Sequence, residues 1–202
     1  MPSQTFLNLK PDKKNKIIEA AIEELSLHPY EYINLANIIR DAKIPRGSFY
    51  QYFKDKDDLY RFFYGYIGER KMSYFKDLFD PTLDLPFIDR FNQLYLKGFE
   101  FAQAYPKLTQ IGQKMLASPY YLNDPMVQKG KQQVIDLYTT WLNVDQEKGR
   151  IRKDLDARLM STMLFEFMNK ITLDSKLDDF DAIKDAVHML TDVLKKGIEV
   201  HV

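Results

Sequence analysis

The sequence contains no cysteine, and glycine supplies only eight of its 202 residues. Without cysteine the chain has no disulfide, no thiolate nucleophile and no cysteine-bound metal, and this composition favours a reducing, cytoplasmic environment. No apolar run reaches the roughly 18 residues of a membrane span, so no membrane partner is predicted. The opening residues also lack the apolar core of a secretory signal.

Groups suited to catalysis are scarce. The three histidines, His28, His188 and His201, have no partner at metal-binding spacing. Adjacent acids such as Glu23 and Glu24 point to different helix faces, so we interpret them as solvated charge. Because no glycine-rich phosphate loop is present either, the sequence predicts no enzyme, no cofactor and no metal site.

Positive charge is concentrated locally, although the formal net charge is +0. Four lysines accompany one aspartate between residues 1 and 18. Three lysines and one arginine accompany one aspartate between residues 43 and 56. Any contact with nucleic acid would therefore depend on these two basic segments rather than on overall charge.

Apolar residues recur with the period of amphipathic helices, and no strand-like alternation is sustained. Prolines and polar caps divide the pattern into nine predicted helices. The first helix is expected from Asp12 to His28, the second begins at Asn34, the third at Pro45, and the fourth runs from Lys56 to Phe79. The fifth begins at Pro86 and the sixth at the stretch AYPKL. The seventh ends at Gly149, the eighth begins at Asp156, and the ninth follows the stretch DDFD. We therefore predict an all-α, two-domain architecture, with three short helices in residues 1–55 and a larger helical domain in residues 56–202.

The short helices after Asn34 and Pro45 have the spacing of a helix-turn-helix. Arg46 and Gln51 suit base edges, and Gly47 would let a duplex approach closely. Hydroxyl and ammonium groups nearby suit phosphates. The expected DNA contacts are Asn34, Pro45, Arg46, Gly47, Ser48, Tyr50, Gln51, Tyr52, Lys54 and Lys56. Composition alone is equally compatible with a solvated basic loop whose aromatic residues only pack.

The order of these residues resembles the DNA-binding signature of the TetR/AcrR family of bacterial transcriptional regulators. That pattern has a capping residue, a short helix, an Ala-Gly-Val turn, a Ser-Lys-Gly-Thr-Leu-Tyr-x-Tyr/His-Phe stretch and a Lys-acid-x-Leu stretch. This sequence has Asn34, AKI, PRGSFYQYF and KDDL in the same register. The resemblance implies a repressor that binds double-stranded operator DNA as a homodimer and is released by a small hydrophobic or amphipathic molecule. A helical protein-interaction module without DNA binding is the alternative.

Three residues depart from the family pattern. Lys43 stands at the usual turn glycine, where a left-handed residue would cost roughly 1–2 kcal/mol. Ile39 replaces a usual alanine, and Pro45 replaces a small polar cap. We expect these changes to alter the turn slightly and to affect the angle of the second short helix, which would read the bases.

The resemblance also implies a ligand pocket and a dimer interface in residues 56–202. The expected ligand contacts are Phe62, Tyr66, Tyr95, Phe99, Met115, Tyr138, Trp141 and Phe165. The expected dimer contacts on the last two helices are Leu159, Met163, Phe167, Val187, Leu190 and Leu194. Both sets would also suit the ordinary core of a single chain, so these assignments are hypotheses.

Overall fold

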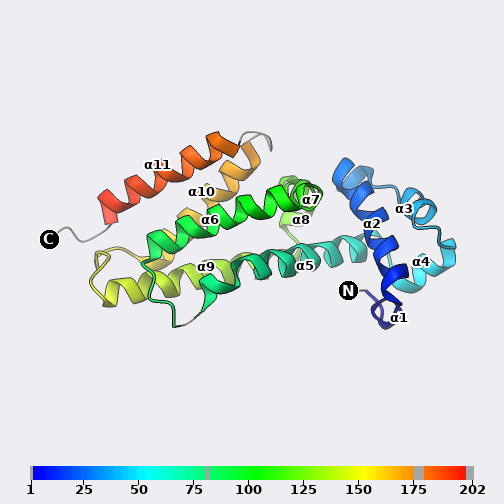
Figure 1. The fold of residues 1–202 in the computed structure, drawn as a ribbon, viewed down its shortest axis with the longest axis horizontal. Helices are drawn as coiled ribbons and strands as arrows, with labels where there is room; N and C mark the ends of the chain where they lie inside the picture. The colour runs from blue at the N-terminus through cyan, green and yellow to red at the C-terminus, as the bar shows by residue number, and fades with distance from the viewer. Residues whose placement is uncertain (1, 81, 175–179, 199–202) are drawn as a thin grey trace. The chain divides into compact units, whose positions relative to one another are not determined.

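The computed structural model describes residues 2–80, 82–174 and 180–198, and within these ranges it contains helices and no strand (Figure 1). The all-α prediction is confirmed. The α-helices are α1 (Gln4–Leu7), α2 (Pro11–Leu27), α3 (Leu35–Asp41), α4 (Arg46–Tyr52), α5 (Lys56–Phe75), α6 (Phe87–Ala104), α7 (Pro106–Ala117), α8 (Pro119–Leu122), α9 (Pro125–Glu147), α10 (Ala157–Asp174) and α11 (Phe180–Ile198). Two 3₁₀ turns, η1 (Tyr30–Tyr32) and η2 (Lys76–Phe79), complete the order.

Several helix ends follow the local signals in the sequence. The Asn34 side chain accepts a hydrogen bond from the Ala36 amide at the start of α3. Asp156 accepts from the amides of Arg158 and Leu159 at the start of α10. Gly149, with φ 72, follows α9 in the left-handed conformation that glycine tolerates.

Other boundaries differ from the prediction of nine helices. The short helices α1 and α8 were not predicted, and the expected helix over 56–79 tightens into a 3₁₀ turn after Phe75. The start of α2 is also different, since Pro11 occupies its first turn and Lys10 the capping position, without a side-chain hydrogen bond. Asp12 therefore lies inside the first turn, where its charge favours the positive end of the helix dipole.

The chain forms two compact units. The first contains Met1–Lys71 together with Tyr105–Leu122, and the second contains Met72–Ala104 together with Asn123–Val202. The domain boundary expected after residue 55 stays a prediction, because these units describe compactness rather than function.

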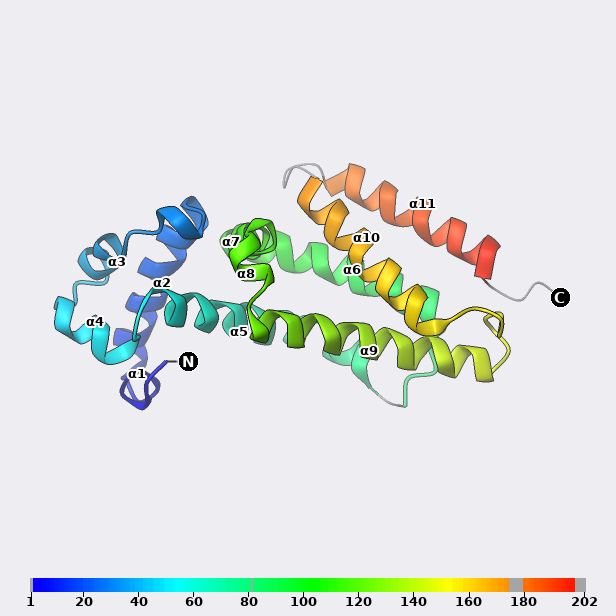
Figure 2. The same ribbon diagram turned by 180° about the vertical axis from the view of Figure 1, so that it is seen from behind.

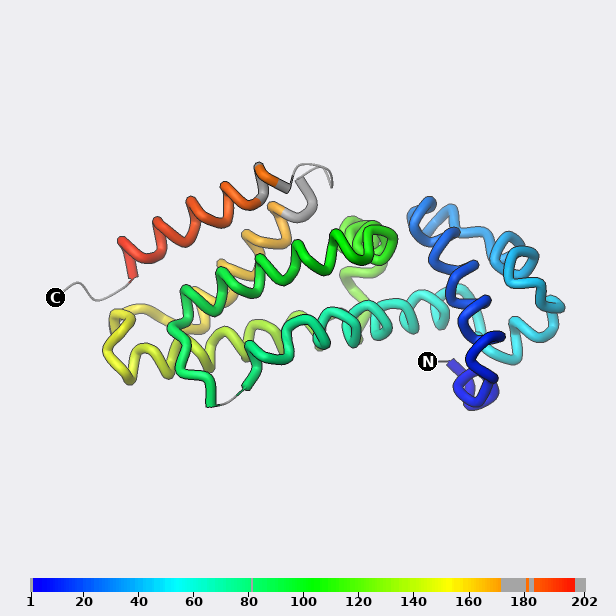
Figure 3. The backbone as a smooth tube through the Cα atoms, viewed as in Figure 1, coloured from blue at the N-terminus to red at the C-terminus, as the bar shows by residue number. Residues whose placement is uncertain are grey.

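The first unit has an aromatic core beneath the short helices. In it α2 packs against α3 and α7, and α1 packs against α4. Figure 3 draws the path of the backbone through these helices. Phe6, Phe49 and Phe63 are fully buried, and Phe53 is nearly so. Because the rings come from α1, α4, α5 and the α4–α5 connection, burial of this cluster fixes the short helices to one another.

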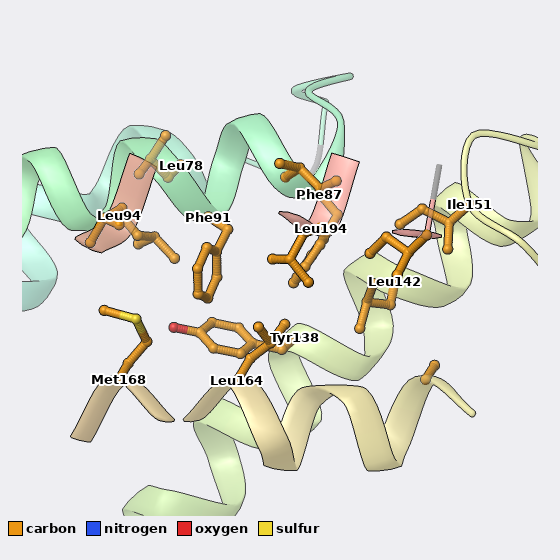
Figure 4. Packing of buried hydrophobic residues seen from close by; sticks show 14 residues of the cluster. Leu78, Phe87, Phe91, Leu94, Tyr138, Leu142, Ile151, Leu164, Met168 and Leu194 are labelled. Atoms are coloured by element: carbon orange, nitrogen blue, oxygen red, sulfur yellow. The ribbon is translucent and has the colours of Figure 1, made fainter. Parts of the chain in front are cut away.

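The second unit buries a core between α6, α9, α10 and α11. Helix α10 packs along α9, and α11 packs along α6 (Figures 1 and 2). Figure 4 shows Phe91 of α6 pointing toward Tyr138 of α9, with Met168 and Leu164 of α10 beside it. The ring centroids of Phe91 and Tyr138 lie 5.8 Å apart in an edge-to-face arrangement.

Two buried charged groups tie the start of α6 to its surroundings. Arg90 donates to the carbonyl oxygens of Leu78 (3.0 Å) and Leu83 (2.6 Å). Asp145, only 3% exposed, accepts from the amide of Phe87 (2.6 Å) and from the guanidinium of Arg150 (3.1 Å). Their hydrogen bonds offset the cost of burying charge.

No helix in the described ranges is both long and apolar enough to span a membrane.

Candidate nucleic-acid interface

The turn between α3 and α4 is closed by main-chain hydrogen bonds. Lys43 adopts φ 53, so this residue takes the left-handed conformation despite its Cβ. Its amide donates to the carbonyl of Arg40 (3.1 Å), and the Ile44 amide donates to the carbonyl of Ile39 (3.2 Å). These two bonds form a Schellman motif, and Ile44, the residue after the left-handed position, is buried. The turn therefore keeps a glycine-type geometry at a residue that is not glycine.

Helix α3 is held at its start by a carboxylate of α2. Glu24 is 6% exposed, and its two oxygens accept from the Asn34 amide (2.7 Å) and from the Asn37 side chain (3.0 Å). The interpretation of Glu24 as solvated charge was wrong. The first amides of a helix lack intrahelical partners, and a carboxylate from a neighbouring helix satisfies one of them here. The neighbouring Glu23 is exposed and pairs with Lys107.

Helix α4 is anchored on one side and exposed on the other. Phe49 is fully buried, whereas Arg46, Gly47, Tyr50 and Gln51 are exposed. Arg46 and Tyr50, like Gly47 and Gln51, are four residues apart and share one face. A Cβ built on Gly47 would meet nothing within 4 Å, so packing inside the chain does not require glycine there.

The other expected DNA contacts have different surroundings. Asn34, Pro45 and Lys54 are exposed, and Ser48 is half-buried. Tyr52 is 4% exposed and packs against Phe6, which separates its ring from the exposed face of α4. Lys56 is half-buried, and its ammonium donates to the Tyr30 carbonyl (2.9 Å) and lies 4.2 Å from that ring. The phosphate roles of Tyr52 and Lys56 stay predictions.

An acid and two tyrosines join α8 to η1 and α5 within the first unit. Both tyrosine hydroxyls donate to Asp57, that of Tyr120 at 2.6 Å, and the two rings stack with centroids 4.8 Å apart. Although burial opposes ionisation, the hydrogen bonds from Tyr120 and Tyr30 hold the pKa of Asp57 below its usual value. Helix α7 adds a hydrogen bond from Lys114 to the Ser26 carbonyl (2.5 Å). These contacts connect a later segment of the chain directly to the helices around the turn.

The expected ligand contacts are divided between the two units. Phe62, Tyr66 and Met115 belong to the first unit, and the others, Tyr95, Phe99, Tyr138, Trp141 and Phe165, belong to the second. In the second unit the Tyr95 and Tyr138 hydroxyls share a hydrogen bond, and burial raises the pKa of Tyr138 to about 12. Their role in ligand binding stays a prediction.

The expected dimer contacts fall on two kinds of surface. Leu159, Met163 and Phe167 of α10 are 58%, 57% and 47% exposed and follow one another at four-residue intervals. The three residues of α11 pack instead on the unit's own core, with Val187 and Leu194 buried and Leu190 partly buried. Among the described side chains of α11, the exposed large apolar ones are Met189 and Val193.

The sequence analysis missed the segment before α2. Ser3 donates from its amide to the Tyr52 carbonyl (2.9 Å) and from its hydroxyl to the Gln51 carbonyl (2.6 Å). Phe6 is fully buried beside Phe53, with ring centroids 4.7 Å apart. A serine followed three residues later by an aromatic residue was the available signal, because serine is a favoured helix cap.

The all-helical fold, with the exposed helix α4 following α3 after a tight turn, defines a helix-turn-helix protein. Residues 17–61 match the family model described as "Bacterial regulatory proteins, tetR family". The helix-turn-helix segment of the chain is therefore of the tetR type, as its sequence signature predicted.

Individual proteins were also compared with this chain. The curated "Transcriptional regulator AcuR" of Cereibacter sphaeroides is 30% identical over 73 residues, which span 36% of this chain and 30% of that protein. A TetR family transcriptional regulator from Chloroflexus aurantiacus has a TM-score of 0.75 at 22% identity, with both chains fully covered. FadR from Bacillus subtilis, solved with stearoyl-CoA, has a TM-score of 0.70 at 20% identity over 93% of this chain and 99% of that chain. The structural likeness extends the shared fold beyond the segment matched by the family model.

Proposed function

We propose that this chain is a transcriptional repressor that binds operator DNA through α3 and α4 as a homodimer. A small hydrophobic or amphipathic molecule would release it. The observation that carries DNA binding is the exposed face of α4, where Arg46 and Gln51 stand beyond the buried anchor Phe49. A helix of this kind, presented after a tight turn, suits the major groove.

The base-reading role can be separated from the phosphate role by two substitutions. The test duplex is one that the wild-type protein selects from a random pool. On this duplex Arg46→Ala should lose roughly 1–3 kcal/mol of binding free energy, and it should relax sequence preference. Lys54→Ala should weaken selected and random duplexes alike, because a phosphate contact carries no sequence information. Lys54 is a sharper probe than Lys56, whose ammonium already binds Tyr30. Equal losses on both duplexes for Arg46→Ala would refute base reading.

Gly47 offers a test that leaves the protein's packing intact. A Cβ at this position has open space around it, so Gly47→Ala should preserve or slightly raise stability. The same methyl group would stand between α4 and a duplex, and we expect weaker DNA binding. Unchanged affinity for the selected duplex would mean that DNA does not approach this face.

The alternative, a protein-interaction module, predicts a different response to salt. Phosphate contacts release counterions, so DNA affinity should fall steeply as salt rises. A partner bound by apolar contacts would dissociate much less. Absence of any salt-sensitive binding to duplex DNA by the full chain would favour the module.

The homodimer would use an apolar seam, defined as Leu159, Met163 and Phe167 of α10 with Met189 and Val193 of α11. Exposed apolar residues on two successive helices are the kind of surface that a two-fold partner can cover. Met163→Glu should give monomers in light scattering, because the charge would be buried without a partner. Val144→Glu, at an exposed apolar position on α9, is the matched control. A folded Met163→Glu protein that stays dimeric would move the interface elsewhere.

An amphipathic effector is supported by the stearoyl-CoA complex of the structurally similar FadR. Trp141 lies on the aromatic cluster of the second unit, stacked near Tyr138 at 5.9 Å, and is the only tryptophan. We would titrate stearoyl-CoA while following Trp141 fluorescence, with and without the selected duplex. A coupling of roughly 1–3 kcal/mol should weaken both ligands reciprocally by about 5–150-fold. Identical stearoyl-CoA affinities in the two titrations would exclude this compound as an inducer.

A further inference from the structure

The segment Ser3–Leu7 closes on the far end of α4. A helix leaves its last four carbonyl groups without intrahelical partners. In α4, which has seven residues, the carbonyls of Gln51 and Tyr52 accept from the hydroxyl (2.6 Å) and the amide (2.9 Å) of Ser3. One residue, far away in sequence, therefore satisfies two of these groups.

An aromatic anchor holds the same segment in place. Phe6 is fully buried and lies between rings of α4, its C-cap residue and α5, with centroid distances of 6.0 Å to Tyr52, 4.7 Å to Phe53 and 5.3 Å to Phe62. The hydroxyl of Ser3 also accepts from the Phe6 amide (3.3 Å), so the polar and apolar contacts belong to one short turn. The anchor is specific to Phe6, because its neighbour Leu7 is 46% exposed.

We propose that Ser3 and Phe6 are positioning residues for base reading: they form a clip that fixes the orientation of α4 and hence of Arg46 and Gln51. This inference rests on the proposed DNA binding. A helix of two turns is marginal by itself and takes its direction from tertiary contacts. At its beginning α4 is fixed by the turn at Lys43, and its cap residue Pro45 makes no side-chain hydrogen bond. The clip supplies the second fixed point, at the end nearest Gln51.

The position of the clip also links α4 to the first basic segment. The Lys14 ammonium lies 5.4 Å from the Phe6 ring, and that of Lys13 lies 5.7 Å from the Tyr52 ring. Displacing Phe6 would therefore disturb the aromatic rings against which two lysines of α2 lie, as well as the end of α4. The expected result is a loss of sequence discrimination in addition to any loss of stability.

Ser3→Ala tests the polar half of the clip without creating a large cavity. It removes the bond to the Gln51 carbonyl and the bond from the Phe6 amide, and it should weaken binding to the selected duplex by about 2–10-fold. Binding to random duplex should change less than about twofold, because phosphate contacts tolerate small shifts of the helix. Gln4→Ala is the matched control, since its exposed side chain donates to Asn8 within the same short turn.

Phe6→Ala and Phe6→Leu test the apolar half, with Leu7→Ala as the control. We expect Phe6→Ala to lower the ratio of selected to random affinity about tenfold or more, and Phe6→Leu to restore most of it. All measurements are made well below each variant's melting temperature. If both affinities fall together, in proportion to the folded fraction, or if Ser3→Ala leaves the ratio unchanged, the positioning role is overturned.

Hydrogen exchange separates failure of the clip from failure of the proposed function. In the free protein, Phe6→Ala should accelerate exchange of the α4 amides relative to those of α9, whereas Leu7→Ala should not. Unchanged α4 exchange would refute the clip, whatever the DNA results. A wild-type protein that binds no duplex, with α4 exchange still sensitive to Phe6, would refute DNA binding and with it the base-reading role.

Discussion

Replacing Lys43 with glycine should stabilise the protein. Lys43 has φ 53, where the Cβ of an L-residue crowds the following carbonyl at a cost of roughly 1–2 kcal/mol. The hydrogen bonds of the turn on either side fix this conformation, so the residue cannot relax by rotating. Glycine removes the crowding but loses about 0.5–1 kcal/mol more chain entropy on folding. Taken near the middle of the two ranges, the expected net gain is about 0.5–1 kcal/mol.

Scanning calorimetry is the direct assay. For a chain of this size, 1 kcal/mol corresponds to a shift of about 2–4 °C, so Lys43→Gly should melt about 1–4 °C higher. Lys43→Ala is the matched control, because it also removes the exposed ammonium but keeps the Cβ, and it should shift the midpoint little. If the glycine variant melted no higher than the alanine variant, relief of left-handed strain would not be the source of stability, and the reasoning would be refuted.

Three further predictions concern stability elsewhere in the chain. Gly149→Ala should cost roughly 0.5–1 kcal/mol net in urea unfolding, all of it from the backbone, because its Cβ would meet no atom within 4 Å outside the adjacent residues; a neutral result would contradict the left-handed cap. Glu24→Ala should cost about 1–3 kcal/mol by leaving the Asn34 amide unpaired, and Glu24→Gln should cost less; equal losses would point to packing. Because the pKa of Asp57 is lowered in the fold, its stabilising effect is present above about pH 4 and is lost as pH falls through the folded value; Asp57→Asn should flatten the acid limb of urea midpoints, and an unchanged limb would contradict this.

Local chemistry made several features of the fold predictable. Asn34, Asp156 and Gly149 occupy caps whose residue preferences follow from neighbouring main-chain groups. The left-handed position at Lys43 was likewise recognisable by comparing the turn with a family pattern. These features depend on a few adjacent residues, which a sequence displays directly.

Features that depend on distant partners could not be predicted in the same way. Glu24 resembles any surface acid until α3 brings its amides close, and Ser3 has no visible acceptor until α4 ends beside it. In α11, one apolar stripe contains Val187 and Leu194 and another contains Met189 and Val193. Helical period detects both stripes, but only the packing of α6 against α11 determines which one is internal.

The first compact unit is discontinuous, and this has a consequence for folding. The chain leaves the unit after Lys71 and returns at Tyr105, so Tyr120 can reach Asp57 only after the intervening α6 segment has closed a loop. Loop closure costs entropy that grows slowly with the length of the loop. Completion of the first unit therefore requires the chain to span residues 72–104, which contain α6 and belong to the other unit. No single cut can excise the first unit whole, and a fragment ending after α5 would lack the partners that Glu23, Ser26 and Asp57 find in α7 and α8.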